Sequence, residues 1–284
     1  MEKVRVAPEY TIKYLEIDRP SPLSDKHIES LIQDVLFGKM DNDISDNVYS
    51  DFKTTAHNYF NSSILNDLKG LDNFNRVDII NGCTQYIDNL YMQGPVQTVT
   101  GDYRYHSRLN LGYIKDVGSL IPDIPLIIAM PFPRTGNMHD NMQELLDECK
   151  KKNIDVHVDG AWVSCCRDIV FDYNHSAIKS VAISLSKGLG LGWNRVGLRY
   201  TREFKQDSIT IMNDYRMNLR ATVKIGLHFL RHLPVDYLWN KYGESYYKVC
   251  NDFDLTPTKS IYLALRNNEP VGVSPLIRYL NEQY

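Results

Sequence analysis

Residues 183–200 read ISLSKGLGLGWNRVGLRY, so two serines and a lysine stand directly before a run of glycines, and Arg195 follows that run. The β-branched run at 180–184 predicts a strand that ends just before the lysine. The run RVGLRYT at 195–201 predicts a further strand, with an antiparallel orientation as one option. Hydroxyl, amine and guanidinium groups therefore gather at the end of one predicted strand.

The chain before this segment alternates between two patterns. Short apolar runs at 76–80, 96–100, 124–130 and 154–158 predict strands, and amphipathic patterns at 84–92, 106–117 and 139–152 predict helices. The run IPLIIAM at 124–130 is apolar at consecutive positions, which is typical of a central strand covered on both faces. The alternation predicts an α/β fold, with a mostly parallel central sheet and helices on both faces.

The flanks predict a second, smaller unit that is mainly helical. Helical patterns occupy 25–37 and 50–69, a long one runs from 207 to Pro234, and another helix and a strand at 259–266 follow. We therefore expect residues 1–60 to contribute to a small lobe and to dimer contacts, and residues 61–206 to form the large domain. The long helix and a reduced C-terminal small domain then occupy residues 207–284.

Composition bounds the function. The 284 residues carry a formal net charge of -3, so the chain has no overall positive field for nucleic acid or anionic lipid. It has no run of eighteen apolar residues and no apolar core of the secretory type near its start, which predicts a cytoplasmic protein that does not enter membranes. The five cysteines lack metal-site spacing, and His157 and His175 lack ligand partners, so we expect no metal site.

The residues that follow the predicted strands carry the candidate chemistry, because ligands of open α/β sheets collect outside the carboxyl ends of the strands. In chain order these segments read NGCT, GDYRYH, PFPRTG, DGAW and SLSK. They offer a hydroxyl-bearing turn, an aromatic ring, a carboxylate beside an indole, and a lysine between hydroxyls. This set suits a planar, phosphorylated, nitrogen-containing cofactor that bonds covalently to an amine.

Three of the motifs, DGAW at 159–162, SLSK at 184–187 and RVG at 195–197, resemble the fold-type I pyridoxal 5'-phosphate enzymes of the class I/II aminotransferase group. The resemblance covers residues 45–200. It implies that Lys187 forms a Schiff base with the cofactor and then moves a proton at the substrate α-carbon. It further implies that Asp159 pairs with the pyridine nitrogen and that Arg195 and Ser184 hold the phosphate. Ser186 does the same or caps a helix.

The resemblance also assigns roles upstream. Gly82, Cys83 and Thr84 match the family's phosphate-binding turn at a helix N-terminus. Tyr103 matches the ring stacked on the pyridine, with His106 three residues later and Tyr105 as a competing assignment. Tyr49 lies where the family places a tyrosine that reaches the neighbouring subunit's phosphate, which implies a homodimer with shared active sites.

The chain departs from the family pattern at two positions near the cofactor's ring oxygen. Pro133 stands where the family has asparagine, although Asn137 is close enough in sequence to compensate. Trp162 replaces a tyrosine, and its indole N–H can donate a hydrogen bond but has no phenolic proton to lose. The chain is also shorter than typical members, and two arginines are candidates for binding the substrate carboxylate: Arg266 is the first and Arg278 the second.

The resemblance implies an aminotransferase that acts on an amino acid and a 2-oxo acid. Elimination, decarboxylation or oxidation would use the same cofactor contacts and remains an alternative. A third hypothesis, a non-catalytic binding protein on the same fold, is opposed by the joint presence of Asp159, Lys187 and Arg195. The glycines of GLGLGW lack the strand, helix and acidic residue of a dinucleotide fingerprint, and no Gly-x-Ser-x-Gly elbow occurs.

Overall fold

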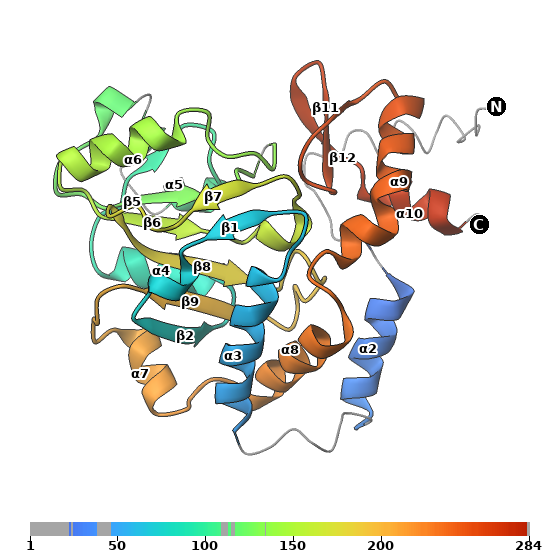
Figure 1. The fold of residues 1–284 in the computed structure, drawn as a ribbon, viewed down its shortest axis with the longest axis horizontal. Coiled ribbons are helices and arrows are strands. Elements are labelled where there is room, and N and C mark those ends of the chain that lie inside the picture. The colour runs from blue at the N-terminus through green and yellow to red at the C-terminus, as the bar shows by residue number, and fades with distance from the viewer. Residues whose placement is uncertain are drawn as a thin grey trace.

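The computed structural model describes residues 23, 25–38, 47–108, 113–114, 117–133 and 135–282 (Figure 1). Its centre is a five-stranded sheet in the order β2-β9-β8-β6-β5. These strands span β2 (Arg76–Ile80), β9 (Gly197–Thr201), β8 (Ile178–Ser184), β6 (Val156–Asp159) and β5 (Leu126–Ala129). β5, β6 and β8 pair in parallel, whereas β9 runs antiparallel to both β8 and β2. The predicted mostly parallel sheet is confirmed, and residues 195–201 take the antiparallel option.

The two faces of the sheet carry separate cores, because successive side chains of a strand point to opposite sides. Ile79 and Ile128 belong to one buried cluster, and their neighbours Ile80 and Ile127 belong to the other. α3 (Val48–Asn61) and α8 (Arg220–His232) pack against each other on the first face, as Figure 1 shows. α4 (Cys83–Met92) and α7 (Ser208–Asp214) contribute to the second. The sheet is therefore covered by helices on both faces.

Several short elements surround this centre. β1 (Asp67–Lys69) pairs in parallel with β7 (Val170–Asp172), and β3 (Thr98–Val99) pairs in parallel with β4 (Tyr113–Ile114). Further elements around this centre, among the described residues, are α5 (Arg104–Arg108), α6 (Met142–Lys151), and the 3-10 turns η1 (Leu71–Asn73), η2 (Val117–Ser119) and η3 (Val163–Cys165).

The last part of the chain forms a small lobe. It contains α9 (Tyr237–Asp252), α10 (Ser274–Glu282) and an antiparallel sheet of β10 (Thr256–Pro257), β11 (Leu263–Arg266) and β12 (Glu269–Gly272). The helix α2 (Lys26–Leu36), from the other end of the chain, is linked to this lobe. Its N-cap residue Asp25 is buried and accepts hydrogen bonds from Lys241 (2.6 Å) and Tyr242 (2.5 Å) of α9.

The charge of Asp25 is stabilised by these contacts. Burial alone would raise the pKa of the carboxyl, but the hydrogen bonds from Lys241 and Tyr242 outweigh burial and lower it. The backbone N–H groups of His27 and Ile28 add two more hydrogen bonds, at 2.8 Å and 2.9 Å. One carboxylate therefore caps α2 and joins it to α9. The division of the chain at residues 60 and 206 stays a prediction, and residues 1–22 lie outside the described part.

Three predicted helices differ from the structure. The pattern at 106–117 is wrong as a helix: α5 ends at Arg108, and Tyr113–Ile114 is a strand because it pairs with β3. The long helix after residue 207 is interrupted between α7 and α8, where Arg216 has a left-handed backbone with φ 54°. The pattern at 50–69 ends as a helix at Asn61, and Asp67–Lys69 forms β1 instead.

Within the described residues, none of the helices combines the length and apolar character that a membrane span requires.

Candidate active site

The predicted site residues meet at one edge of the central sheet. β2, β5, β6 and β8 end at this edge, and the antiparallel β9 begins there. The register aligns Ile80 and Ser184 with the same residue, Gly197. Arg195, two residues before β9, is therefore brought to the edge at which β8 delivers Lys187.

Arg195 lies against the amino end of α4. Its Nη2 donates to Thr84 Oγ1 at 2.8 Å, and its Nε donates to the Asn81 carbonyl at 3.2 Å. α4 begins after Gly82, which offers no side chain to cap the helix. The first N–H groups of a helix lack partners within the helix, and the helix dipole favours an anion at this end. A guanidinium and a helix amino end thus face the same place, as an anion site requires.

Cys83 and two serines lie beside Arg195 and the start of α4. The Cys83 thiol is fully buried and contacts both Asp159 and Ser184; burial and the nearby Asp159 carboxylate raise the pKa of the thiol, so it stays protonated. Ser184 Oγ accepts the N–H of Ser186 at 3.2 Å. The buried hydroxyl of Ser186 has no hydrogen-bond partner among the described residues. The structure thus brings together Gly82, Cys83, Thr84, Ser184, Ser186 and Arg195.

Asp159 is the last residue of β6, and its carboxylate is buried. Oδ1 accepts the Ala161 N–H at 3.0 Å, and Oδ2 lies 3.1 Å from Nε2 of His106. The other ring nitrogen of His106, Nδ1, lies 3.3 Å from Oδ2 of Asp102, an ion-pair contact without the alignment of a good hydrogen bond. His106 therefore lies between two carboxylates.

Tyr103 lies at the mouth of this site and Tyr105 points elsewhere. The Tyr103 ring is 44% exposed and stands edge-on to the His106 ring, with 5.5 Å between the ring centroids. The hydroxyl of Tyr105 donates to Asp88 of α4 at 2.6 Å. Of the two candidates for the stacking ring, Tyr103 is thus the one that adjoins the residues linked to Asp159.

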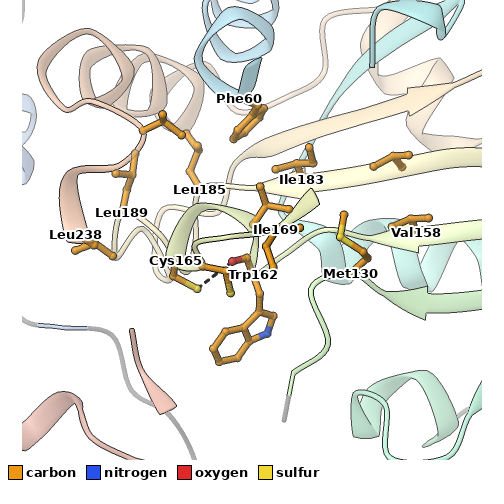
Figure 2. Packing of buried hydrophobic residues seen from close by; sticks show 14 of the residues in the cluster. Phe60, Met130, Val158, Trp162, Cys165, Ile169, Ile183, Leu185, Leu189 and Leu238 are labelled. Atoms are coloured by element: carbon orange, nitrogen blue, oxygen red, sulfur yellow. Dashed lines mark hydrogen bonds between the residues drawn. The ribbon is translucent and has the colours of Figure 1, made fainter. Parts of the chain in front are cut away.

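Lys187 lies in a turn at residues 186–189, three residues after the end of β8. Its Nζ is 5.3 Å from the ring centroid of Trp162, a cation–π geometry. Figure 2 shows that the indole of Trp162 extends from the buried cluster, away from the other labelled side chains. An aromatic face therefore lies against the lysine amine where the family pattern has a phenol.

Two neighbours of this site carry no recognisable signal in the sequence. The Tyr262 hydroxyl, from the small lobe, donates to the Lys187 carbonyl at 2.6 Å, and the Tyr262 ring is edge-on to Trp162. Met130 directly follows β5, and its N–H donates to the Asp159 carbonyl at 2.9 Å. The residue after β5 that bonds to Asp159 is thus Met130, through its backbone. Neither Met130 nor Pro133 has a side-chain amide that could replace the family's asparagine.

Among the described contacts, none joins three of the predicted residues to this cluster. Tyr49 lies on α3, and its hydroxyl donates to the Asn218 carbonyl at 2.9 Å. Arg266 ends β11 at an exposed hairpin, opposite Glu269. Arg278 lies on α10 and is partly buried. Their roles toward a second subunit or a substrate stay predictions.

Known protein structures share this fold. A PLP-bound C-S lyase from Staphylococcus hominis aligns at a TM-score of 0.58 and 12% identity, over 91% of this chain and 77% of that one. The histidinol-phosphate aminotransferase from Clostridium acetobutylicum aligns at 0.57 and 12% identity, over 87% and 80%. The aspartate aminotransferase from Thermus thermophilus with maleate aligns at 0.57 and 13% identity, over 88% and 75%.

At these identities the likeness shows the fold: the chain has the fold of these aminotransferases and this lyase. The resemblance drawn from the DGAW, SLSK and RVG motifs is confirmed at this level. No model of a known protein family matches the sequence, and no curated protein matches it.

Proposed function

We propose that this chain binds pyridoxal 5'-phosphate covalently at Lys187 and transfers an amino group between an amino acid and a 2-oxo acid. The observation that carries the proposal is the convergence at one sheet edge of Lys187, the buried carboxylate of Asp159, and Arg195 at the amino end of α4. These supply an amine, an anion and a cation, which are the partners of an aldehyde, a pyridinium and a phosphate.

The residues fit this cofactor. The uncapped amino end of α4, the Arg195 guanidinium and the unpartnered hydroxyl of Ser186 are donors suited to a phosphate. A Cβ built on Gly82 would lie 2.7 Å from Arg195 Nη2, so the missing side chain keeps space open beside the guanidinium. Asp159 adds a carboxylate that keeps a cationic ring nitrogen protonated.

Each residue then has a defined task. When bound, the cofactor supplies an electron sink for the charge that forms at the substrate α-carbon. Lys187 holds the aldehyde carbon and moves a proton at the substrate α-carbon. Asp159 holds the proton on the ring nitrogen, and Arg195 with the end of α4 anchors the phosphate. Trp162 covers one side of the lysine amine with an apolar face and limits the access of water to it.

A test of the lysine assignment uses the visible absorption of the protein with added pyridoxal 5'-phosphate, followed by borohydride reduction and mass mapping. We expect the reduced label on Lys187, and no label in Lys187→Ala. Lys179→Ala is the matched control, because Lys179 lies near the other end of β8, the strand that precedes Lys187. A wild-type protein without a reducible adduct, or an adduct that survives in Lys187→Ala, would contradict the proposal.

The reaction is tested by adding single amino acids to the loaded protein without an amino acceptor. Transfer predicts one conversion of the cofactor for each site and no further turnover until a 2-oxo acid is added. Catalytic release of ammonia or carbon dioxide from the same mixture would exclude transfer as the main reaction.

A second candidate is elimination, decarboxylation or oxidation at the same site. The observation that favours it is the Trp162 indole, which lies against the Lys187 amine where the family pattern has a phenol. The same acceptor-free assay separates the two candidates. Trp162→Tyr provides a further comparison, since it restores a phenol; under this second candidate it shifts the product ratio toward transfer.

We further propose that a second copy of the chain covers the segment between α7 and α8. Tyr215, Met217 and Leu219 are exposed there, although they are large and apolar. Asn218 is buried beside them, and neither its amide nitrogen nor its amide oxygen has a hydrogen-bond partner among the described residues. Tyr49 bonds to the same segment, which links it to the expected subunit interface.

The oligomeric state tests this interface. Leu219→Asp should convert a dimer into a monomer in sedimentation experiments and weaken cofactor binding. Ile64→Asp is the control, because Ile64 is also exposed and lies between α3 and β1. A wild-type monomer that binds the cofactor fully would contradict the shared site.

A further inference from the structure

Three buried side chains form a continuous charged chain behind the proposed cofactor site. His106 lies between Asp102, 3.3 Å from Nδ1, and Asp159, 3.1 Å from Nε2. All three side chains are at most 4% exposed. Asp102 and His106 are four residues apart around the start of α5, so a single helical turn sets their spacing.

Asp102 is itself held by hydrogen-bond donors. Its Oδ2 accepts the Ala129 N–H at 3.0 Å and the Thr98 hydroxyl at 3.3 Å, and its Oδ1 accepts the Tyr103 N–H at 2.5 Å. Backbone donors from β5 and from the residue before α5 thus fix the position of this buried carboxylate. Backbone N–H groups at the sheet edge therefore hold the Asp102 carboxylate, as the Ala161 N–H holds that of Asp159.

His106 is charged in this environment. Burial alone would lower its pKa, but the Asp102 and Asp159 carboxylates outweigh burial and raise the pKa of His106 to about 9. Among the described residues, the Cys83 thiol and the Tyr86 hydroxyl also interact with Asp159, and burial raises the pKa of both groups, so neither adds a charge. Two carboxylates and one imidazolium leave the buried chain with one net negative charge.

We propose that Asp102 is a positioning residue that keeps His106 as an imidazolium and, through it, fixes the orientation of the Asp159 carboxylate. The imidazolium donates its Nε2–H to Oδ2 of Asp159, while Ala161 donates to Oδ1. With a neutral residue in place of Asp102, His106 loses the charge partner on its Nδ1 side, so its pKa falls and the ring loses its proton at a lower pH. Asp159 then loses the cationic donor that holds it.

The effect of the Asp102–His106–Asp159 contacts on cofactor binding rests on the proposed function, so the test begins with the cofactor-free protein. We expect the imidazole of His106, followed by NMR in the full-length cofactor-free protein, to titrate near pH 9. Asp102→Asn should lower that pKa by about 1 to 3 units. Asp102→Glu should restore part of the shift, and Asp67→Asn, at an exposed aspartate of β1, should leave it unchanged.

A second measurement is the affinity for pyridoxal 5'-phosphate, which Asp102→Asn should weaken and Asp67→Asn should not. A wild-type His106 that titrates near its ordinary pKa of 6.5 overturns the inference without any variant, even where Asp102→Asn fails to fold. An Asp102→Asn protein with an unchanged His106 pKa also overturns it. A pKa near 9 in a protein that forms no lysine adduct would sustain the charge assignment and defeat the proposed function instead.

Discussion

Gly82 has a backbone φ in the left-handed region and leaves no room for a side chain, so other residues fit poorly at this position. Its φ is +74°, and a Cβ there would collide with the Arg195 guanidinium. We expect Gly82→Ala to destabilise the fold and to displace Arg195, which weakens binding of inorganic phosphate and of the cofactor. Gly38→Ala is the matched control, because Gly38 has a similar φ of +73° but nothing within 4 Å of its Cβ position. Equal binding losses in the two variants would contradict this role of Gly82.

His106 predicts a pH dependence of stability. Its folded-state pKa of about 9 lies above the ordinary 6.5, so its contribution is complete below pH 6.5 and is lost as the pH rises toward 9. Over this range the free energy of unfolding should fall by up to about 1.4 kcal/mol per pH unit. Urea denaturation of the cofactor-free protein at several pH values measures this slope. His106→Gln should lose this slope. If the variant keeps the same slope, the pH dependence belongs to another group.

At this scale the sequence predicts those residues that stand in recognisable motifs. Lys187, Asp159 and Arg195 fall in three such motifs, and the structure brings them to one sheet edge. Asp102 carries no such mark, because an aspartate four residues before a histidine is common at the surface of helices. Met130 and Tyr262 could not be predicted, since only the folded backbone brings them beside Asp159 and Lys187.

At the scale of secondary-structure elements, two ion pairs of the buried Arg199 join β2, β9 and the start of α7. Arg199 of β9 donates to Asp78 of β2 at 2.8 Å and to Asp207, the N-cap of α7, at 2.5 Å. We expect Asp78→Ala to lower the free energy of unfolding by about 3 kcal/mol, because it leaves a buried guanidinium partly unpaired. Asp214→Ala removes only the exposed partner of Arg76 and should cost about 0.5 kcal/mol. Equal losses in chemical denaturation would contradict this assignment.

The predictions of elements succeeded where local pattern and burial agree. All the central strands were predicted within two residues at each end, because consecutive buried β-branched residues have few alternatives. The helix predicted at 106–117 failed because its periodic pattern ignores the pairing of Tyr113–Ile114 with β3. The helix predicted from 207 failed at Arg216, whose left-handed conformation is unusual for a residue with a Cβ.

At the scale of the whole molecule, Asp25 couples the beginning of the chain to its end. We expect Asp25→Asn to lower the free energy of unfolding by about 2 kcal/mol at neutral pH, since charge-assisted hydrogen bonds to Lys241 and Tyr242 are lost. The pKa of Asp25 is lowered from 3.8, so this difference should persist above that value and vanish as acid protonates the wild-type carboxyl. Amide exchange of α2 and acid titration measure both effects, and Asp34→Asn on the same helix is the control.

The central sheet and its covering helices could be predicted from the alternating pattern, whereas the lobe at the chain ends could not be specified in detail. Its strands β10, β11 and β12 are short, and its packing depends on single contacts such as the Tyr262 hydroxyl on the Lys187 carbonyl. The sequence also gives no distance between Arg266 and the sheet edge. That distance depends on how far the β11–β12 hairpin extends.

The antiparallel pairing of β8 with β9 has a consequence for how the protein folds. Lys187 and Arg195 both lie in the connection between two strands that are adjacent in sequence and in the sheet. Closing so short a loop costs little chain entropy, so these two strands can pair before distant parts of the chain have folded. We therefore expect the amine and the guanidinium to become neighbours early in folding, while Asp159 and the end of α4 arrive later through longer crossovers. A substitution at Gly197, where an added Cβ would strike Ile183 of the paired strand, should slow folding more than it speeds unfolding.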